Sequence, residues 1–170
     1  VGINLSGASV NDDEFAQFVE ERVATSRLPA ARLCFEITET SAVRDLAQAQ
    51  RFIQRIRALG CKFALDDFGA GFCSFSYLRS LDVDIFKIDG SFVRDVHQSP
   101  LALAIVRSIA EIARVMRKQT IAEYTESETI RSHLVALGVD YAQGFAIERP
   151  LPLEDLFAPP DPADRLRQAS

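Results

Sequence analysis

Long apolar runs are missing from this sequence. No run approaches the ~20 residues that a membrane-spanning helix needs, and no positively charged segment leads into an apolar stretch at the start, as in a secretory signal. Of the 170 residues, 48% are hydrophobic and 25% are charged, which is typical of a soluble globular domain. We therefore expect one domain in the cytoplasm, with a membrane anchor in further upstream segments as the open alternative.

The cysteine pairs that build disulfide frameworks and zinc sites are missing as well. The three cysteines, Cys34, Cys61 and Cys73, are an odd number and form no Cys-x-x-Cys motif. We expect Cys34 and Cys61 to be small buried side chains in a reducing compartment. We expect Cys73, which follows the two glycines of a polar loop, to be more exposed.

Positive charge is in short supply. The net charge is −5 and the isoelectric point is about 5.1, which argues against DNA and other long nucleic acids as partners. A small anionic nucleotide is compatible with this charge if divalent metal ions mediate its binding.

The chain alternates between short β-rich runs and longer stretches with helical periodicity. We predict strands at 2–5, 32–37, 62–66, 85–88, 120–123 and 141–146, and helices at 12–28, 43–59, 91–97, 100–117 and 127–137. Such alternation predicts a parallel sheet. We expect residues 1–156 to form the domain and the proline-containing tail at 157–170 to be disordered.

Two α/β architectures fit the six predicted strands. A (β/α)₈ barrel needs eight strands, whereas an open doubly wound sheet is built from about six and carries a glycine-rich phosphate motif after its first strand. That motif is absent here. The residues at the strand ends favour the barrel, so we predict a TIM-like (β/α)₈ barrel that lacks two strands.

Each predicted strand finishes with a polar side chain. In isolation every one of these residues has an ordinary structural explanation, such as a turn former or a paired charge. Together they place four carboxylates on the rim that carries the active site in parallel barrels, and such crowding requires compensating positive charge. The strand-end residues, in chain order, are Asn4, Glu36, Asp66, Asp67, Lys87, Glu123 and Gln143.

The donors at this rim are oxygen atoms, because His97 and His133 are expected on helices away from it. Oxygen ligands favour Mg²⁺ or Mn²⁺. The adjacent Asp66 and Asp67 suit a pair of ions, and paired ions promote phosphodiester hydrolysis. Gly69 and Gly71 then give a mobile loop beside the acids, which suits a lid or a substrate contact.

Six blocks of the sequence, taken together, resemble the successive signatures of EAL domains. They are INLSG, FEITET, LDDFGAGFCSFSYL, FKIDGSFV, IAEYTESE and YAQGFAIERPLP, and they cover residues 1 to about 156. The resemblance implies an incomplete barrel of the EAL type that binds cyclic di-GMP. It also implies hydrolysis of this second messenger to linear pGpG with two Mg²⁺ or Mn²⁺ ions.

The resemblance also implies roles for individual residues. Lys87 resembles the lysine that polarises the attacking water, and Glu126 resembles a second catalytic residue that contacts the waters of the metal site. Glu39 resembles the glutamate that holds the loop after Asp67. The implied metal-site residues are Asn4, Glu36, Asp66, Asp67, Glu123 and Gln143, and the implied loop and substrate residues are Phe68, Gly69, Gly71, Arg149 and Pro150.

The sequence departs from the EAL pattern in three places. It begins at the INLS strand, so the hairpin that carries the Glu-Ala-Leu motif, with one metal ligand, is absent. We therefore expect a piece of a longer protein, inactive alone, or a barrel closed by another chain, since open strand edges are a liability. Tyr124 and Thr125 replace a small apolar pair, and Glu148 replaces a small residue.

Three functions stay open at this point. The first is a cyclic di-GMP phosphodiesterase, which the kept ligand positions favour. The second is an inactive receptor or protein-interaction module of the same family, and the third is a metal-dependent enzyme that abstracts a proton with Lys87 as the base. For the full-length protein we expect a homodimer and an upstream sensor or GGDEF-type domain.

Overall fold

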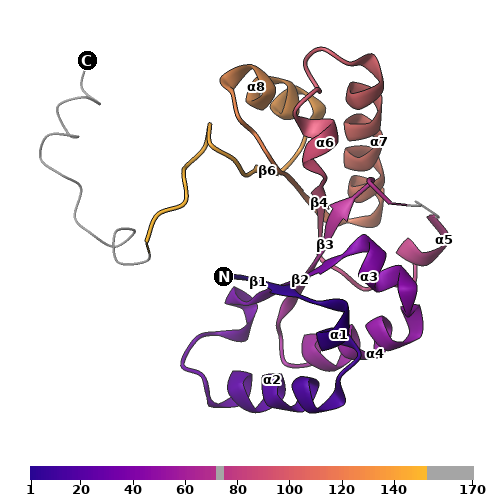
Figure 1. The fold of residues 1–170 in the computed structure, drawn as a ribbon, viewed down its shortest axis with the longest axis vertical. Helices are drawn as coiled ribbons and strands as arrows, with labels where there is room; N and C mark the ends of the chain where they lie inside the picture. Colours follow the sequence, from indigo (N-terminus) through magenta and orange to yellow (C-terminus); the bar gives the residue numbers. More distant parts are fainter. Residues whose placement is uncertain (72–74, 153–170) are drawn as a thin grey trace, which may run out of the picture.

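A computed structural model describes residues 1–71 and 75–152 of the chain (Figure 1). Its centre is a parallel sheet of six strands in sequence order, as the sequence predicts. No pairing joins the first strand to the last within the described residues, so the sheet is an open, incomplete barrel. The strands are β1 (Gly2–Leu5), β2 (Cys34–Thr38), β3 (Lys62–Phe68), β4 (Ile85–Ile88), β5 (Gln119–Ala122) and β6 (Tyr141–Ala142).

Helices connect successive strands, which is the connection that parallel pairing requires. In Figure 1 the helices α1 to α4 gather below the strands, and α6 to α8 gather above them. The helices are α1 (Gly7–Val10), α2 (Asp13–Thr25), α3 (Glu39–Arg44), α4 (Leu46–Arg57), α5 (Phe75–Leu78), α6 (Gly90–Val93), α7 (Pro100–Met116) and α8 (Glu128–Leu137), with a 3₁₀ turn at Ala30–Arg32.

Several predicted boundaries were wrong for local reasons. The predicted helix 43–59 is two helices, because Asp45 leaves the helical conformation and caps α4 by accepting a hydrogen bond from Gln48 N at 3.1 Å. The predicted helix 12–28 ends at Thr25, since Ser26 is extended. The predicted strand 141–146 stops at Ala142, and the predicted helix 91–97 shrinks to Gly90–Val93.

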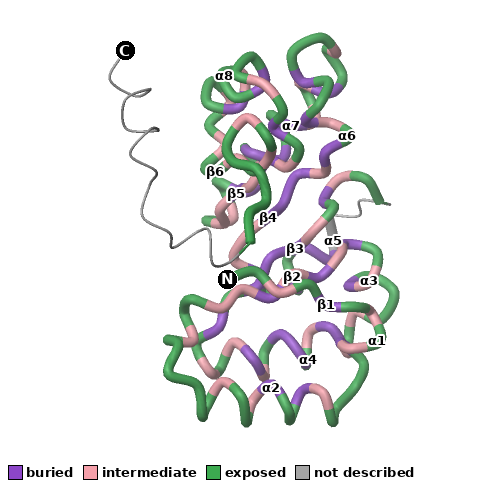
Figure 2. Tube along the Cα trace, turned by 60° about the vertical axis from the view of Figure 1, so that its left-hand side comes forward, coloured by how far each residue is buried: buried purple, intermediate pink, exposed green. Residues whose placement is uncertain are grey.

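The core lies between the sheet and the helices that cover it (Figure 2). Phe63 of β3 is fully buried, with its ring 5.7 Å from that of Phe35 and 6.1 Å from that of Phe52. Each aromatic ring buried in this way stabilises the fold by roughly 1.5–3 kcal/mol. The packing makes β2 to β4 the rigid base on which the polar residues at the strand ends stand.

The cysteines that the structure describes are free. Cys61 is buried, as predicted, and Cys34 is half-buried on β2, where burial raises the pKa of its thiol to about 11. Cys73 and the predicted tail at 157–170 lie outside the described residues. Among the helices within 1–71 and 75–152, none is long and apolar enough to cross a membrane.

Candidate active site at the carboxyl ends of the strands

Lys87 lies at the centre of the candidate site. Its neighbours along β4, Phe86 and Ile88, are fully buried, so the alternation of side chains turns Lys87 to the other face of the sheet. The side chain of Lys87 is only 6% exposed. Carboxylates from three other strand ends surround its Nζ atom, which lies 2.7 Å from Glu36 Oε2, 2.8 Å from Asp66 Oδ1 and 2.8 Å from Glu123 Oε1.

The charge of Lys87 is fixed by these neighbours. Burial alone lowers the pKa of its ammonium group, but the hydrogen bonds to the surrounding carboxylates outweigh burial and hold the pKa above the ordinary range. Lys87 is therefore a cation at neutral pH. One ammonium group balances one of the three carboxylates, so the cluster keeps a net negative charge.

Asp67 adds a fourth carboxylate next to this cluster. Its backbone is left-handed, with φ 53°, a conformation that Asp tolerates better than most residues. Burial, followed by the negative charges of Asp66 and Asp89, raises the pKa of Asp67. Burial is also the main cause that raises the pKa of Glu123, against the opposing effect of Lys87. Both shifts have burial as their first cause and neighbouring acids as a further cause.

The donors present fit divalent cations. One oxygen from each of Asp66, Asp67 and Glu123 can be chosen so that all three lie within 4.8 Å of one another. Asp66 Oδ1 is buried, and it faces the ammonium group of Lys87 at 2.8 Å in an ion pair that falls outside hydrogen-bond geometry. Hard oxygen donors that converge in this way suit Mg²⁺ or Mn²⁺, and a divalent cation would reverse the raised pKa values of Asp67 and Glu123.

The loop that follows Asp67 is tied to Glu39, the first residue of α3. Glu39 is 2% exposed, and its carboxylate accepts hydrogen bonds from Gly69 N at 3.0 Å and from the Tyr77 hydroxyl. Gly69 has φ 100°, which disfavours any other residue, and a Cβ atom on Gly71 would lie 3.2 Å from the carboxyl carbon of Glu39. We call Glu39, Gly69 and Tyr77 the loop latch.

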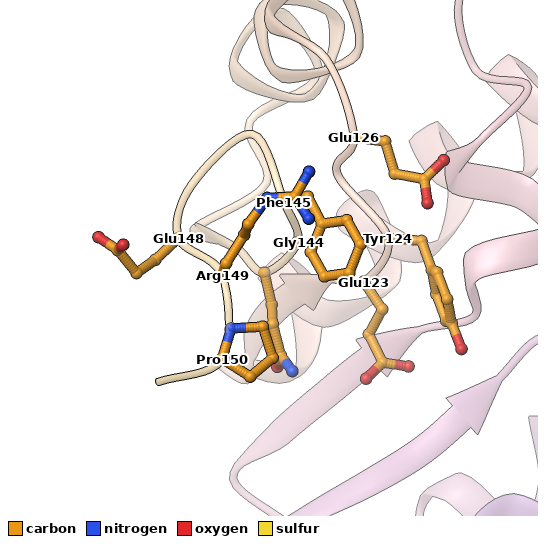
Figure 3. Close-up of a pocket in the computed structure, with 9 residues that line it drawn as sticks. Glu123, Tyr124, Glu126, Gly144, Phe145, Glu148, Arg149 and Pro150 are labelled. Carbon is orange, nitrogen blue, oxygen red and sulfur yellow. The ribbon is translucent and has the colours of Figure 1, made fainter. Parts of the chain in front are cut away.

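A pocket of about 440 Å³ opens beside Glu123 (Figure 3). Four of the predicted site residues share it with Glu123, and Figure 3 shows Glu148 at its edge, pointing away from Glu123. The guanidinium group of Arg149 lies 4.7 Å from the centre of the Phe145 ring. The pocket is lined by Glu123, Tyr124, Glu126, Gln143, Gly144, Phe145, Glu148, Arg149 and Pro150.

Two further predicted site residues differ in their burial. Asn4 is exposed on the edge strand β1, where it pairs in register with Glu36. Phe68 is fully buried, and its ring stacks on Phe86 with 4.9 Å between the ring centres. The side chain of Phe68 therefore belongs to the core, and only its main chain leads into the loop.

Two residues shape the site in ways that were not predicted from the sequence. Tyr77, which binds Glu39, carries no signal in its local sequence. Thr125 is fully buried, its N–H donates to Gln143 O at 3.0 Å, and its carbonyl accepts from Ala146 N at 2.9 Å. Any side chain at Gly144 would overlap the Thr125 main chain. Thr125 thus joins the loops that follow β5 and β6, which form the pocket.

Comparison with known proteins decides the family. A model of the EAL domain matches residues 1–150. The chain belongs to the EAL domain family. This EAL chain is 42% identical over 153 residues to the cyclic di-GMP phosphodiesterase PdeB of Shewanella oneidensis. The match covers 90% of this chain and 18% of PdeB. It is equally 42% identical to the cyclic di-GMP phosphodiesterase PdeF of Escherichia coli K12, covering 90% of the chain and 20% of PdeF.

Solved EAL structures confirm the predicted fold class. The phosphodiesterase PaMucR, in complex with c-di-GMP, superimposes with a TM-score of 0.87 at 30% identity, over 92% of this chain and 63% of that chain. The EAL domain of Mycobacterium smegmatis DcpA gives 0.86 at 34% identity, over 91% of this chain and 69% of that chain. The EAL chain thus spans about two thirds of these structures and about a fifth of the curated relatives.

Proposed function

We propose that this EAL chain is the catalytic part of a phosphodiesterase that hydrolyses cyclic di-GMP to linear pGpG with two divalent metal ions. The observation that carries the proposal is the ring of Glu36, Asp66 and Glu123 around Lys87, each within 2.8 Å of Nζ. Relatives at 42% identity that are named cyclic di-GMP phosphodiesterases support the substrate.

The residues of the site have different proposed roles according to where they lie. The carboxylates of Glu36, Asp66, Asp67 and Glu123, with Asn4 and Gln143 at the neighbouring strand ends, are the groups that would hold Mg²⁺ or Mn²⁺. When bound, such ions lower the pKa of water and stabilise negative charge on phosphoryl oxygens. Lys87, charged and hydrogen-bonded, is placed to orient the attacking water. Glu126 and Arg149 border the pocket beside Glu123 that would receive the nucleotide.

The charge on Lys87 separates this proposal from proton abstraction with Lys87 as the base. A general base must be deprotonated near the operating pH. The carboxylates raise the pKa of Lys87 above its ordinary range, which is the opposite of what a base requires. Homodimer formation and an upstream sensor or GGDEF-type domain stay predictions for the full-length protein.

The test is chromatography of the product that the full-length protein forms from cyclic di-GMP in Mg²⁺ or Mn²⁺. We expect linear pGpG, with no product after the ions are removed with EDTA and product again when they are restored. Binding of cyclic di-GMP without any product would contradict the proposal and favour the receptor alternative. Absence of both binding and product would contradict either function.

A further inference from the structure

Tyr124 is the most unusual residue of the pocket. It follows Glu123 directly, its backbone has φ 52°, and its side chain is a large aromatic group that is 49% exposed. A left-handed backbone is uncommon outside glycine, asparagine and aspartate. It is also where the sequence departs from the small apolar pair of the EAL pattern. A strained position that carries an exposed ring beside a site acid calls for an explanation.

The Tyr124 ring is held in place by α6. The guanidinium group of Arg94 lies 4.0 Å from the centre of the ring. Gly90, one turn earlier on the same helix face, lies so close that any side chain there would overlap the ring. A ring held by a cation and a backbone loses little freedom when a ligand stacks on it.

Tyr124 lines the pocket beside Glu123. In Figure 3 the rings of Tyr124 and Phe145 lie on the two sides of the Glu123 side chain. A guanidinium group also lies over each ring, that of Arg94 over Tyr124 and that of Arg149 over Phe145. Aromatic rings with nearby guanidinium groups are the usual platforms for nucleic acid bases and their phosphates.

We propose that Tyr124 is a specificity-determining residue whose ring stacks on one purine base of the cyclic dinucleotide. Arg94 is the positioning residue that holds the ring toward the pocket. The proposal rests on the proposed function and adds a base contact that the small apolar residues of the EAL pattern would not make.

The first test compares variants of the full-length protein in Mg²⁺. Tyr124→Asn removes the ring but tolerates the left-handed backbone, and we expect KM for cyclic di-GMP to rise about 10-fold with kcat almost unchanged. Tyr124→Phe keeps the ring and should leave both constants near those of the wild type. Arg94→Gln, which frees the ring, should raise KM less than Tyr124→Asn does.

The second test reads stacking directly. The chain has no tryptophan, so the fluorescence that Tyr124→Trp adds to the wild type reports on the pocket. We expect added cyclic di-GMP to quench it by stacking. The matched control is Tyr141→Trp, because Tyr141 is 53% exposed at the other end of β6, and its added fluorescence should not change.

Four results would overturn the proposal. Two of them contradict only the stacking role, provided that the wild type still hydrolyses cyclic di-GMP. One is an unchanged KM in Tyr124→Asn, and the other is Tyr124→Trp fluorescence that does not change when the ligand is added. A fall in kcat with unchanged KM shows that Tyr124 merely supports Glu123. If the wild type neither binds nor hydrolyses cyclic di-GMP, the proposed function fails and the stacking role fails with it.

Discussion

At the amino ends of the strands, the acidic side chains are matched by donors. Arg57 Nε lies 3.1 Å from Asp82 Oδ2, and Arg57 also pairs with Asp84. Lys118 Nζ lies 3.2 Å from Asp82 Oδ1. Asp84 accepts a further hydrogen bond from Phe63 N at 2.9 Å, so each of these acids has a cation and the charges balance.

The last strand shows the same matching without a cation. Asp140, which precedes β6, accepts hydrogen bonds from Thr120 N and from Thr120 Oγ1, both at 2.8 Å. One carboxylate thereby joins β5 to β6. This carboxylate stabilises the sheet, and its charge is compensated by hydrogen bonds instead of a cation.

At the carboxyl ends of the same strands the balance is broken. Among the residues that the structure describes, Lys87 is the single cation paired with Glu36, Asp66 and Glu123, and Asp67 adds a further acid. Burial and mutual repulsion raise the pKa of Asp67 and of Glu123 there. In parallel α/β barrels one end carries stability and the other carries the chemistry. The difference between the two ends supports the proposed site at the carboxyl ends of the strands in this chain.

The largest expected effect comes from removing the cation at the carboxyl end. Lys87→Met leaves buried carboxylates without their partner, so we expect the free energy of unfolding in EDTA to fall by about 3–5 kcal/mol and hydrolysis of cyclic di-GMP to be lost. Chemical denaturation and product chromatography measure the two effects.

The matched control at the amino end is Lys118→Met. Asp82, its partner, has a side chain that is 60% exposed, and such pairs contribute about 0–1 kcal/mol. We expect nearly unchanged stability and activity. Equal losses in the two variants would remove the distinction between the ends.

The second effect comes from removing metal ions. Ions that bind only the folded state at about 100 times their Kd stabilise it by about 2.7 kcal/mol, so EDTA should lower the unfolding free energy of the wild type by that order. Asp67→Asn keeps the left-handed backbone but removes a charge, and should lose most of the stabilisation that the metal ions provide. Asp82→Asn, at the amino end, should keep it.

The third effect compares two carboxylates that accept two hydrogen bonds each, the buried Glu39 and the exposed Asp140. Glu39→Gln keeps an acceptor for Gly69 N and turns the other oxygen into a donor to the Tyr77 hydroxyl, so the charge-assisted bonds of the loop latch become neutral ones at a cost of about 1–3 kcal/mol. Asp140→Asn should cost less, because both donors of Thr120 bind one oxygen of Asp140, which the Asn amide oxygen can replace.

Activity separates these two variants. We expect Glu39→Gln to raise KM for cyclic di-GMP because the loop beside Asp67 loosens, and we expect Asp140→Asn to leave KM unchanged. Steady-state kinetics on both variants measures this, and the same KM in both would deny the latch a role in the site.

The smallest effect is a pH dependence of stability in EDTA. Below the ordinary pKa of 4.5, Glu123 is protonated in both states. Above it, the folded state retains the proton until its raised pKa, so the stability contributed by Glu123 is lost as pH rises through that range. Glu123→Gln does not titrate. Its stability relative to the wild type should therefore increase from about pH 4 to pH 7 in denaturation curves. A relative stability that falls with pH would mean that Lys87 lowers the pKa of Glu123 more than burial raises it.

Residues fixed by strand periodicity could be predicted from the sequence. Lys87, Asp66 and Glu123 end strands whose register follows from alternating βα units, so their convergence follows from topology alone. The loop latch could not be predicted in full, because Tyr77 reaches Glu39 across 38 positions of sequence. The contact of Arg94 with Tyr124 likewise depends on how α6 packs, which no local pattern encodes. The break at Asp45 depends on a cap that competes with helix propensity.

The most direct test of the difference between the ends is calorimetric titration of Mn²⁺ into the full-length protein and two double variants. We predict two bound ions per chain in the wild type, loss of this binding in Asp66→Asn with Asp67→Asn, and unchanged binding in Asp82→Asn with Asp84→Asn. Wild-type binding that survives the loss of Asp66 and Asp67 would contradict a metal site at the carboxyl ends of the strands.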